Sequence, residues 1–488
     1  MSQLLTKTHF LAGRQCPLRL WFELYQPAPK DVSPSQQNLF RWGQRIGARA
    51  RQLFPTGQRV WAVGEKGIEV TRDLIKGDAP IFFEAGFEAD RAFAAIDVLV
   101  REPGGFRAIE VKMKSGAKPP DDELLDELAF EYLVMRESGL EVTRMELMRL
   151  NPACVFPDLD DLFATVDATA ECEARLDAVR GVARQLLPVL DGDRPDIAPG
   201  SQCKKPDRCP FFDRCNAPLP PDDIRRLYKL NWRRRDALLA QGITSVHNLP
   251  ASFTPTPIQA RQIKALRTGK RVVEPTLGPT LDRVAFPIAF LDFETINLPV
   301  PRFDGMSPWH QVTVQFSCHV LDRDGSIVHH EWLAAGDRDP RPDFAREVLA
   351  AVAGAATVVA HHAGFEAERL KEVAAGVPEL ADQLVALASN LADTEIWLNE
   401  NVYDPAFDSS FSLKKVLPAL TGLGYDDLEV QEGLNASALL EQLLWEPDWL
   451  TRSANQLEQD LLTYCERDTE GLMLLWHELR KMAESTGT

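Results

Sequence analysis

Alternation of apolar and polar residues predicts a pair of strands in the first half of the chain. Residues 87–116 read FEADRAFAAIDVLVREPGGFRAIEVKMKSG, two alternating runs that meet at EPGG, which is typical of strands joined by a tight turn. In the second half, the apolar run AFPIAFLDFETI at 285–296 predicts a buried strand. The stretch 312–334 predicts a hairpin that turns at DRDG. The pattern therefore indicates an α/β protein with strands in both halves.

Apolar residues three and four positions apart predict helices beside these strands. In DDELLDELAFEYLVMRESG, at 121–139, the leucine stripe also contains Glu131. In TYCERDTEGLMLLW, Tyr464 and Asp468 are four positions apart and share a face with leucines. A tyrosine and a carboxylate on an apolar, inward face need a partner or a metal ion.

Two proline-containing breaks divide the chain. APLPPDD begins at residue 217, and VVEPTLGPTL begins at residue 272. They predict three parts: 1–220, a short helical connector at 221–280, and 281–488. A length of 488 residues is consistent with this number of domains.

Composition and charge indicate where the protein is found and what kind of partner it could bind. No run of about 18 apolar residues appears and the N-terminus has no signal-peptide core, so we expect a cytoplasmic protein without a membrane span. The net charge of −18 is uneven: residues 281–488 carry −21, whereas 222–272 carry +8. A basic centre permits a polyanionic partner such as nucleic acid.

Two carboxylates mark the first strand of the last part. In FLDFET, Asp292 and Glu294 share one face of the strand. Neighbouring carboxylates repel unless a cation lies between them, and hard oxygen ligands suit two Mg²⁺ or Mn²⁺ ions. The alternative is a solvated strand end.

Three features in order resemble the DnaQ-type DEDD exonucleases of the tyrosine subclass: Asp-x-Glu on a first strand, an acidic residue after Phe, and Tyr-x3-Asp on a late helix. The resemblance implies a ribonuclease H-like mixed-sheet domain over roughly residues 285–480. The metal ligands that it implies are Asp292, Glu294, Glu366 and Asp468. Tyr464 would orient the attacking water. The family usually has Asp where this chain has Glu366; Asp393 is the stand-in, although we interpret it as a helix cap.

A second set of carboxylates lies on the strand pair of the first part. Asp97 is on one strand, and Glu110 and Lys112 share a face of the next. Carboxylates at adjacent strand ends can bind Mg²⁺, and the lysine can position water and stabilise charge on a phosphate. The alternative for the glutamate and lysine is a surface ion pair.

This block resembles the RecB-type PD-(D/E)XK nucleases, most closely those with an iron–sulfur cluster, such as the CRISPR-associated RecB-like exonucleases. The resemblance implies a restriction-endonuclease-like α/β core whose site contains Asp97, Glu110 and Lys112. Glu84 matches the upstream acidic residue that the family often has. The family has a glutamine roughly where this chain has Glu131, followed by a tyrosine like Tyr132. The early histidine that this family often has is absent from LFRWGQRIGARARQLFP.

Three cysteines, Cys203, Cys209 and Cys215, lie at equal spacing after this core. The iron–sulfur members of the family have one early cysteine and three late ones, and Cys16 matches the early position. The resemblance therefore implies a structural [4Fe–4S] cluster that ties the end of the domain to its first helix. Zinc, whose ligands usually come as closer pairs, and buried thiols are the alternatives. The remaining cysteines, Cys154, Cys172, Cys318 and Cys465, read as ordinary buried thiols.

The connector is basic and aromatic. Its candidate nucleic-acid contacts are Arg225, Arg226, Lys229, Arg233, Arg234 and Arg235. Tyr228 and Trp232 are interleaved with them, which suits stacking on single strands, and LLAQGITSVHNL resembles part of a helix–hairpin–helix element. A solvated basic helix face is the alternative.

Together these patterns predict a metal-dependent nuclease with two nuclease-type domains, acting on DNA or RNA with a single-stranded end in DNA processing, repair or phage defence. The architecture resembles a bacterial family of uncharacterised proteins. A nucleic-acid-binding or sensing protein with degenerate nuclease centres is the main alternative, and an iron–sulfur scaffold for a partner complex is a third.

Overall fold

The computed structural model describes residues 3–27, 32–61, 64–116 and 120–486. The chain divides into two compact units, the first formed by residues 1–218 with 298–310 and the second by 219–297 with 311–488. Helices make up 49% and strands 19% of the protein, which confirms the predicted α/β class. The segment predicted as a connector, 221–280, is therefore part of the second unit.

A mixed sheet forms the centre of the first unit, in the order β2-β3-β4-β5-β6-β7, with β1 paired to β4. The strands are β1 (Leu5–Thr6), β2 (Gln58–Arg59), β3 (Ile81–Ala89), β4 (Ala92–Glu102), β5 (Gly105–Ser115), β6 (Val142–Leu150) and β7 (Phe163–Asp167). Strands β4 and β5 form the predicted hairpin through Gly104 and Gly105, both at positive φ. Strands β5 and β6 are parallel because a helix connects them.

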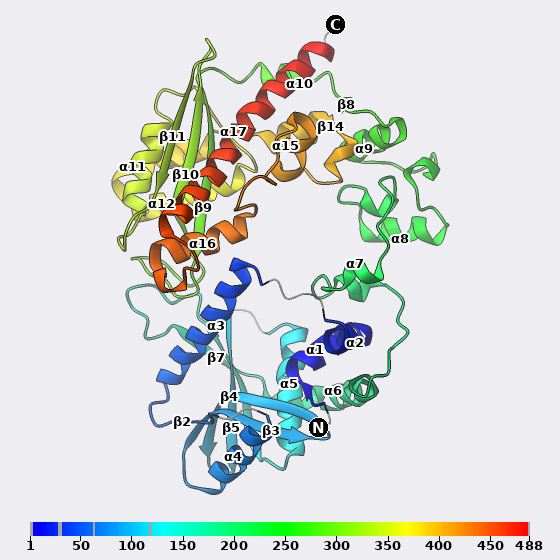
Figure 1. Cartoon of the computed structure of the whole chain (residues 1–488), viewed down its shortest axis with the longest axis vertical. Helices are drawn as coiled ribbons and strands as arrows, with labels where there is room; N and C mark the ends of the chain where they lie inside the picture. Colours follow the sequence, from blue (N-terminus) through cyan, green and yellow to red (C-terminus); the bar gives the residue numbers. More distant parts are fainter. Residues whose placement is uncertain (1–2, 28–31, 62–63, 117–119, 487–488) are drawn as a thin grey trace. The chain divides into compact units, whose positions relative to one another are not determined.

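The helices of the first unit are α1 (Lys7–Gln15), α2 (Pro17–Tyr25), α3 (Pro34–Gln52), α4 (Glu65–Lys76), α5 (Asp122–Glu137), α6 (Thr169–Leu190) and α7 (Phe212–Cys215). Helix α5 packs on β3, β4 and β6, with α6 beside it (Figure 1). Nearly all of α5 is buried, including Glu131, because its apolar residues face the sheet on one side and α1 and α6 on the other. Helix α3 packs on β5 and adds Ala50 to a separate small core.

A five-stranded sheet of order β11-β10-β9-β12-β13 forms the centre of the second unit. The strands are β8 (Val272–Val273), β9 (Ile288–Asn297), β10 (Gln311–Leu321), β11 (Ile327–Leu333), β12 (Thr357–Ala360), β13 (Leu391–Asp393) and β14 (Val402–Tyr403). Strands β9, β10 and β11 are antiparallel neighbours, whereas β12 runs parallel to β9 and β13 runs parallel to β12. Strands β10 and β11 are the predicted hairpin.

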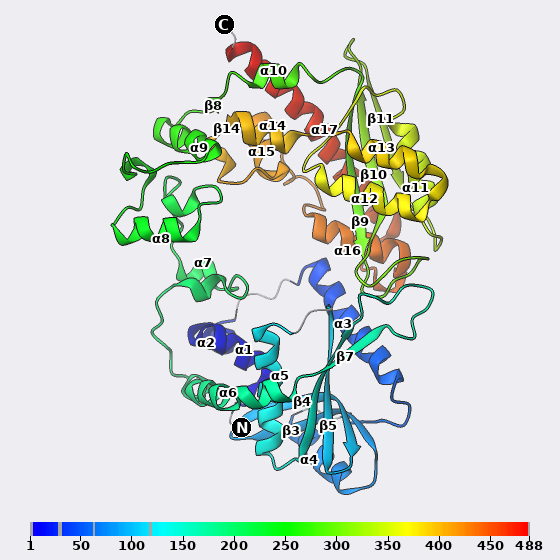
Figure 2. The ribbon, with the colours of Figure 1, turned by 180° about the vertical axis from the view of Figure 1, so that it is seen from behind.

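The helices of the second unit are α8 (Trp232–Ala240), α9 (Pro257–Thr268), α10 (Leu277–Leu281), α11 (Arg341–Ala351), α12 (Gly364–Gly376), α13 (Ala381–Ser389), α14 (Thr394–Asn401), α15 (Leu413–Thr421), α16 (Gly433–Trp445) and α17 (Ala454–Thr486). Helices α11, α12 and α13 share a core with one face of the sheet. Helix α17 lies along β9, β10 and β11, as both views show (Figures 1 and 2). The carboxylates of β9 point away from the α11–α13 core, toward α16 and α17.

The connection between β9 and β10 belongs to the first unit. In this segment, Leu298–His310, the Trp309 indole donates to the Met113 carbonyl at 3.1 Å, and the Phe156 amide donates to the Met306 carbonyl at 2.9 Å. No helix among the described residues is long and apolar enough to cross a bilayer.

Candidate active sites

The acidic residues of β9 lie on one face of the strand, as the alternation predicts. Leu291 and Phe293 enter the hydrophobic core with α11–α13, so Asp292 and Glu294 point to the opposite face. Glu294 is 8% exposed. Strand β9 can present both carboxylates there because β10 and β12 pair with it on either side and fix its pleat.

Helix α17 completes a cluster of three carboxylates. Oxygen atoms of Asp292, Glu294 and Asp468 all lie within 4.8 Å of one another. Burial raises the pKa of Asp292 well above its usual range, and the neighbouring Asp468 and Glu294 raise it further. Burial and Asp468 likewise raise the pKa of Glu294. The pKa of Asp468 rises to about 6 through burial, although the Tyr425 hydroxyl opposes this. Carboxylates gathered in this way repel one another unless protons or a cation lie between them, and their oxygens are close enough to hold a metal ion.

Glu366 is near this cluster but outside its closest group. It lies in the first turn of α12, is 3% exposed, and raises the pKa of both Asp292 and Glu294. Burial raises its own pKa to about 8. Its Oε2 atom is buried without a hydrogen-bond partner among the described residues. The structure therefore brings three of the four predicted ligands together and leaves Glu366 as a nearby carboxylate with an unsatisfied oxygen.

Asp393 is a helix cap, as the sequence indicated. Its carboxylate accepts hydrogen bonds from the amide of Glu395 in α14 and from the amides of His362 and Ala363. These bonds satisfy the start of α14 and the turn before α12. The side chain is thereby committed to backbone groups, and Glu366 remains the candidate from this region.

Tyr464 lies on α17 one turn before Asp468 and is 3% exposed. Burial, together with Asp468, raises the pKa of its hydroxyl, so it stays protonated and can orient a water molecule. A Cβ atom on Gly433 would lie 3.8 Å from this hydroxyl, which places the start of α16 beside it.

Two residues of the second unit's site were missed by sequence reasoning. The Tyr425 hydroxyl donates to the Asp468 carboxylate. The Lys414 ammonium lies 5.5 Å from the Tyr425 ring centre and 5.3 Å from that of Tyr464, and its charge lowers the pKa of Glu294 and Asp468. Lys414 is next to Lys415 in FSLKKV, so nothing in the sequence marks which lysine faces the carboxylates.

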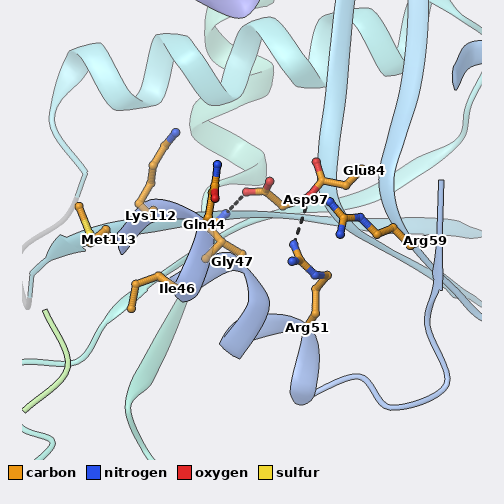
Figure 3. A pocket seen from close by; sticks show the side chains of 11 residues that line it. Gln44, Ile46, Gly47, Arg51, Arg59, Glu84, Asp97, Lys112 and Met113 are labelled. Carbon is orange, nitrogen blue, oxygen red and sulfur yellow. Dashed lines mark hydrogen bonds and ion pairs between the residues drawn. The ribbon is translucent and has the colours of Figure 1, made fainter. Parts of the chain in front are cut away.

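In the first unit, Asp97 lies on β4 beside an open cavity. Its carboxylate accepts a hydrogen bond of 2.8 Å from the Val111 amide of β5. Burial raises its pKa well above the usual range, and Glu110 raises it further. The cavity has a volume of about 710 Å³ and is also lined by Glu84, Lys112 and residues of α3 (Figure 3).

Glu84 and helix α3 form the other wall of this cavity. Glu84 has a φ of 59°, a strained conformation for a non-glycine residue, and ion-pairs with Arg51 at 3.2 Å. Gln44 extends into the same cavity from α3, the helix in which no histidine is present (Figure 3). Gly43 and Gly47 face it too, so the wall lacks side-chain bulk at these two positions.

Glu110 lies among lysines. Its side chain is 2% exposed and ion-pairs with Lys112 at 2.7 Å and with Lys7 at 2.5 Å. Burial alone would raise its pKa, but the two lysines outweigh burial and lower the pKa to about 2. Lys112 also contacts Glu127 at 2.6 Å. The predicted pairing of glutamate and lysine on one face of β5 is therefore part of a larger buried network.

Lys7, at the start of α1, was not singled out in the sequence. Its ammonium contacts Glu131 at 2.7 Å and Glu127 at 3.2 Å in addition to Glu110. Glu131 is fully buried, so the inward orientation inferred from the helical stripe is correct. Tyr132 points elsewhere, because its hydroxyl donates to Glu173 of α6 and accepts from Arg136.

The four predicted cluster cysteines gather around one small core. Cys16, Cys209 and Cys215 pack with Leu18, Phe22 and Phe211. The Cys209 amide donates to the Cys203 carbonyl at 2.9 Å. Burial raises the thiol pKa of Cys215, and the other three cysteines raise it further.

The early and late segments are joined by hydrogen bonds. The Gln15 side chain donates to the carbonyls of Gln202, Lys205 and Asp207. All eight cysteines are free thiols, and no three thiols of the described chain lie within 4.8 Å of one another. Among the described residues, the cysteines are therefore not close enough to one another to indicate an iron–sulfur site.

The basic residues predicted to contact nucleic acid fall into two groups. Arg225 ion-pairs with Asp223 at 2.6 Å, Arg226 with Asp408, and Arg235 with Asp236 at 2.8 Å. The others stack on aromatic rings: Lys229 on Tyr228, Arg233 on Trp232 and Arg234 on Phe253. Trp232 is 58% exposed. Lys229, Arg233 and Arg234, which stack on aromatic rings, are the residues of this surface that a nucleic-acid strand could contact.

Part of the second unit matches a known family of domains. A family described as a domain of unknown function, DUF2779, matches residues 289–412. The match includes Asp292, Glu294 and Glu366 and excludes α17 and the whole of residues 1–288. No curated protein matches the chain.

Proposed function

We propose that this protein is a metal-dependent nuclease in which each unit holds a centre for phosphodiester hydrolysis. The observation that carries the proposal is the cluster of the half-buried Asp292 with the buried Glu294 and Asp468, whose oxygens lie within 4.8 Å of one another. Buried carboxylates at this spacing repel strongly unless protons or cations lie between them. The cluster, the sheet order and the helix α17 support a DnaQ-like exonuclease of the tyrosine subclass for the second unit.

The residues of the second unit's site have separate roles in the proposed hydrolysis. Two divalent cations bound there would activate a water and stabilise the leaving oxygen. Asp292, Glu294 and Asp468 would hold these cations, with Glu366 reaching them through its unsatisfied oxygen. Tyr464, kept protonated by burial, orients the water. Tyr425 fixes the Asp468 carboxylate through its hydroxyl.

For the first unit, a RecB-like centre is supported by the cavity that Asp97, Glu84 and Lys112 line. A second candidate function, nucleic-acid binding by a degenerate centre, is favoured by one observation. Lys7 and Lys112 already neutralise Glu110, so a cation entering there must compete with two ammonium groups.

A structural [4Fe–4S] cluster remains part of the proposal through the resemblance, because clusters take four thiolates. Its support in the structure is that the cysteines come from the early and late segments of the first unit, and that the other three act on the Cys215 thiol. Cys16, Cys203, Cys209 and Cys215 would hold it, closing the unit without a redox role.

The exposed Trp232 and the half-buried Tyr228, each with a neighbouring cation, support a single-stranded nucleic acid as substrate. Trp232 with Arg233 and Tyr228 with Lys229 provide stacking and charge on one short segment. Stacking tolerates any base, so DNA and RNA ends are both candidates, in processing, repair or phage defence.

The test is a cleavage assay on end-labelled single-stranded DNA and RNA with Mn²⁺. Asp292→Asn removes one ligand charge with little change in shape and should reduce cleavage on the order of 10²–10³-fold. Asp97→Asn measures the first centre separately. Glu331→Gln, an exposed acid on β11, is the matched control and should cleave like the parent. A parent protein that leaves all such ends intact contradicts the proposal, and retained binding would then favour the degenerate alternative.

A further inference from the structure

A second group of potential metal ligands lies on the second unit's sheet, apart from the carboxylate cluster. His319 on β10 and His329 on β11 are directly opposite each other, and Glu466 on α17 approaches them. One ligand atom of each lies within 4.8 Å of those of the other two. The two imidazole rings are stacked, with centres 4.3 Å apart and planes 18° from parallel.

Each imidazole ring is hydrogen-bonded to a hydroxyl group. Ser317 is hydrogen-bonded to Nε2 of His329 at 2.9 Å, and Thr469 is hydrogen-bonded to Nδ1 of His319 at 2.8 Å. The two hydroxyls are themselves hydrogen-bonded at 2.6 Å. Metal-binding histidines characteristically use one ring nitrogen for such an orienting bond and the other for the metal.

The remaining nitrogen of His329 faces the carboxylate. Its Nδ1 atom lies 3.7 Å from Oε1 of Glu466, too far for a direct hydrogen bond and close enough for an ion to bind both. Exposure increases across the group, from 6% at His319 to 25% and 45% for the side chains of His329 and Glu466. An ion can therefore reach the site from solvent past the carboxylate.

We propose that His319, His329 and Glu466 form a site for a transition metal of the zinc class, in which the partly exposed His329 ring turns out of the stack so that both imidazoles point a nitrogen at the ion. Two imidazoles and one carboxylate with an open fourth position are a familiar Zn²⁺ ligand set. The carboxylate cluster offers only oxygen and suits Mg²⁺ or Mn²⁺, so the two sites differ in the metal they select.

The consequence of the bound ion is structural. It joins α17 to β10 and β11, and α17 also carries Tyr464 and Asp468. Ser317, which orients His329, lies opposite Asp292 in the pairing of β10 with β9. The ion would therefore hold α17 in register with the strand that carries the catalytic carboxylates.

The experiment measures zinc directly, so it does not depend on nuclease activity. The full chain is stripped with a chelator and dialysed against Zn²⁺, and bound metal is counted for the parent and three variants. His329→Gln and Glu466→Gln change partly exposed side chains. His330→Gln is the matched control, since His330 is exposed and next to His329 on β11. Zinc held elsewhere, at the cysteines for example, cancels in the comparison.

We expect His329→Gln to bind one equivalent of Zn²⁺ less than the parent and than His330→Gln. Glu466→Gln should weaken this equivalent at least tenfold. Zn²⁺ should raise the unfolding temperature of the parent and of Asp292→Asn but not that of His329→Gln. Circular dichroism checks that each variant is folded. Equal zinc content in the parent, His329→Gln and Glu466→Gln would overturn the proposal, because it would mean that the paired histidines only pack and hydrogen-bond.

Discussion

Replacement of Lys7 by methionine tests how the first unit balances its buried acids. Lys7 is the shared partner of Glu110, Glu127 and Glu131, at 2.5, 3.2 and 2.7 Å. Methionine keeps most of the side-chain length and removes the charge. Among the described residues, Glu131 then loses its ion-pair partner, while Glu110 and Glu127 keep Lys112.

The size of the effect follows from burial. Breaking one buried ion pair costs about 3–5 kcal/mol, because a buried charge is left without compensation. Lys7 is 27% exposed, so water screens part of the interaction and the lower end of this range, about 3 kcal/mol, is the better figure. For a domain of this size, that corresponds to a decrease of about 6–12 °C in the unfolding temperature.

Calorimetry of the full chain at neutral pH provides the assay, with the first unit's transition followed in the parent and in Lys7→Met. Lys76→Met is the matched control, because Lys76 is 69% exposed and pairs only with Asp73. Mg²⁺ or Mn²⁺ should recover part of the loss in Lys7→Met, since a cation can occupy the place of the ammonium. A transition within about 2 °C of the parent, without divalent ions, would refute the view that Lys7 compensates these carboxylates.

Three further outcomes are expected. Tyr464→Phe should reduce kcat for strand cleavage by about 10²-fold with Mn²⁺ binding unchanged, and an unchanged kcat would remove Tyr464 from the chemistry. Cys209→Ser should lower the unfolding temperature of the first unit and spare that of the second; a shift of both would contradict a local closure at the cysteines. Burial raises the pKa of Glu366 from 4.5 to about 8, so between these pH values the folded state keeps a proton that the unfolded state has released. The stability of the second unit therefore falls as the pH rises from 4.5 to about 8. Without divalent ions, the free energy of unfolding of the second unit should fall from pH 5 to 8, with Glu366 contributing up to about 1.4 kcal/mol per pH unit. Glu366→Gln should flatten this pH profile. Parallel profiles for the parent and the variant would exclude Glu366 as the source.

The sequence was sufficient wherever one element determines the arrangement. The alternation in FLDFET places Asp292 and Glu294 on one face because a strand with paired neighbours on both sides cannot rotate about its axis. The helical stripe identifies Glu131 as inward for a similar reason, since α5 is covered on nearly all sides. In both cases the period of the element carries the information.

The sequence was insufficient to predict contacts in which a residue from a distant segment pairs with a site carboxylate. Lys7 and Glu110 are 103 positions apart, and Tyr425 and Asp468 are 43 apart. No local periodicity relates such residues, and a lysine on an amphipathic helix reads equally well as a solvated side chain. The left-handed backbone at Glu84 is also invisible to pattern, because a glutamate in a strand is expected to be extended.

The two acidic clusters reduce the repulsion among their carboxylates in different ways, and this difference affects how each would bind metal ions. In the first unit, Lys7 and Lys112 keep Glu110 ionised, with a pKa lowered to about 2. In the second unit, burial raises the pKa values of Asp292, Glu294, Glu366 and Asp468. Lys414, beside two tyrosine rings, opposes this rise at Glu294 and Asp468 without cancelling it. Without metal, the second cluster therefore holds protons, which divalent cations must displace. In the first cluster, burial also raises the pKa values of Asp97 and Glu131, and at Glu110 the cations must in addition move ammonium groups aside. Metal binding at the second cluster should release protons and strengthen with rising pH, and metal binding at the first should depend in addition on the position of Lys7 beside Glu110.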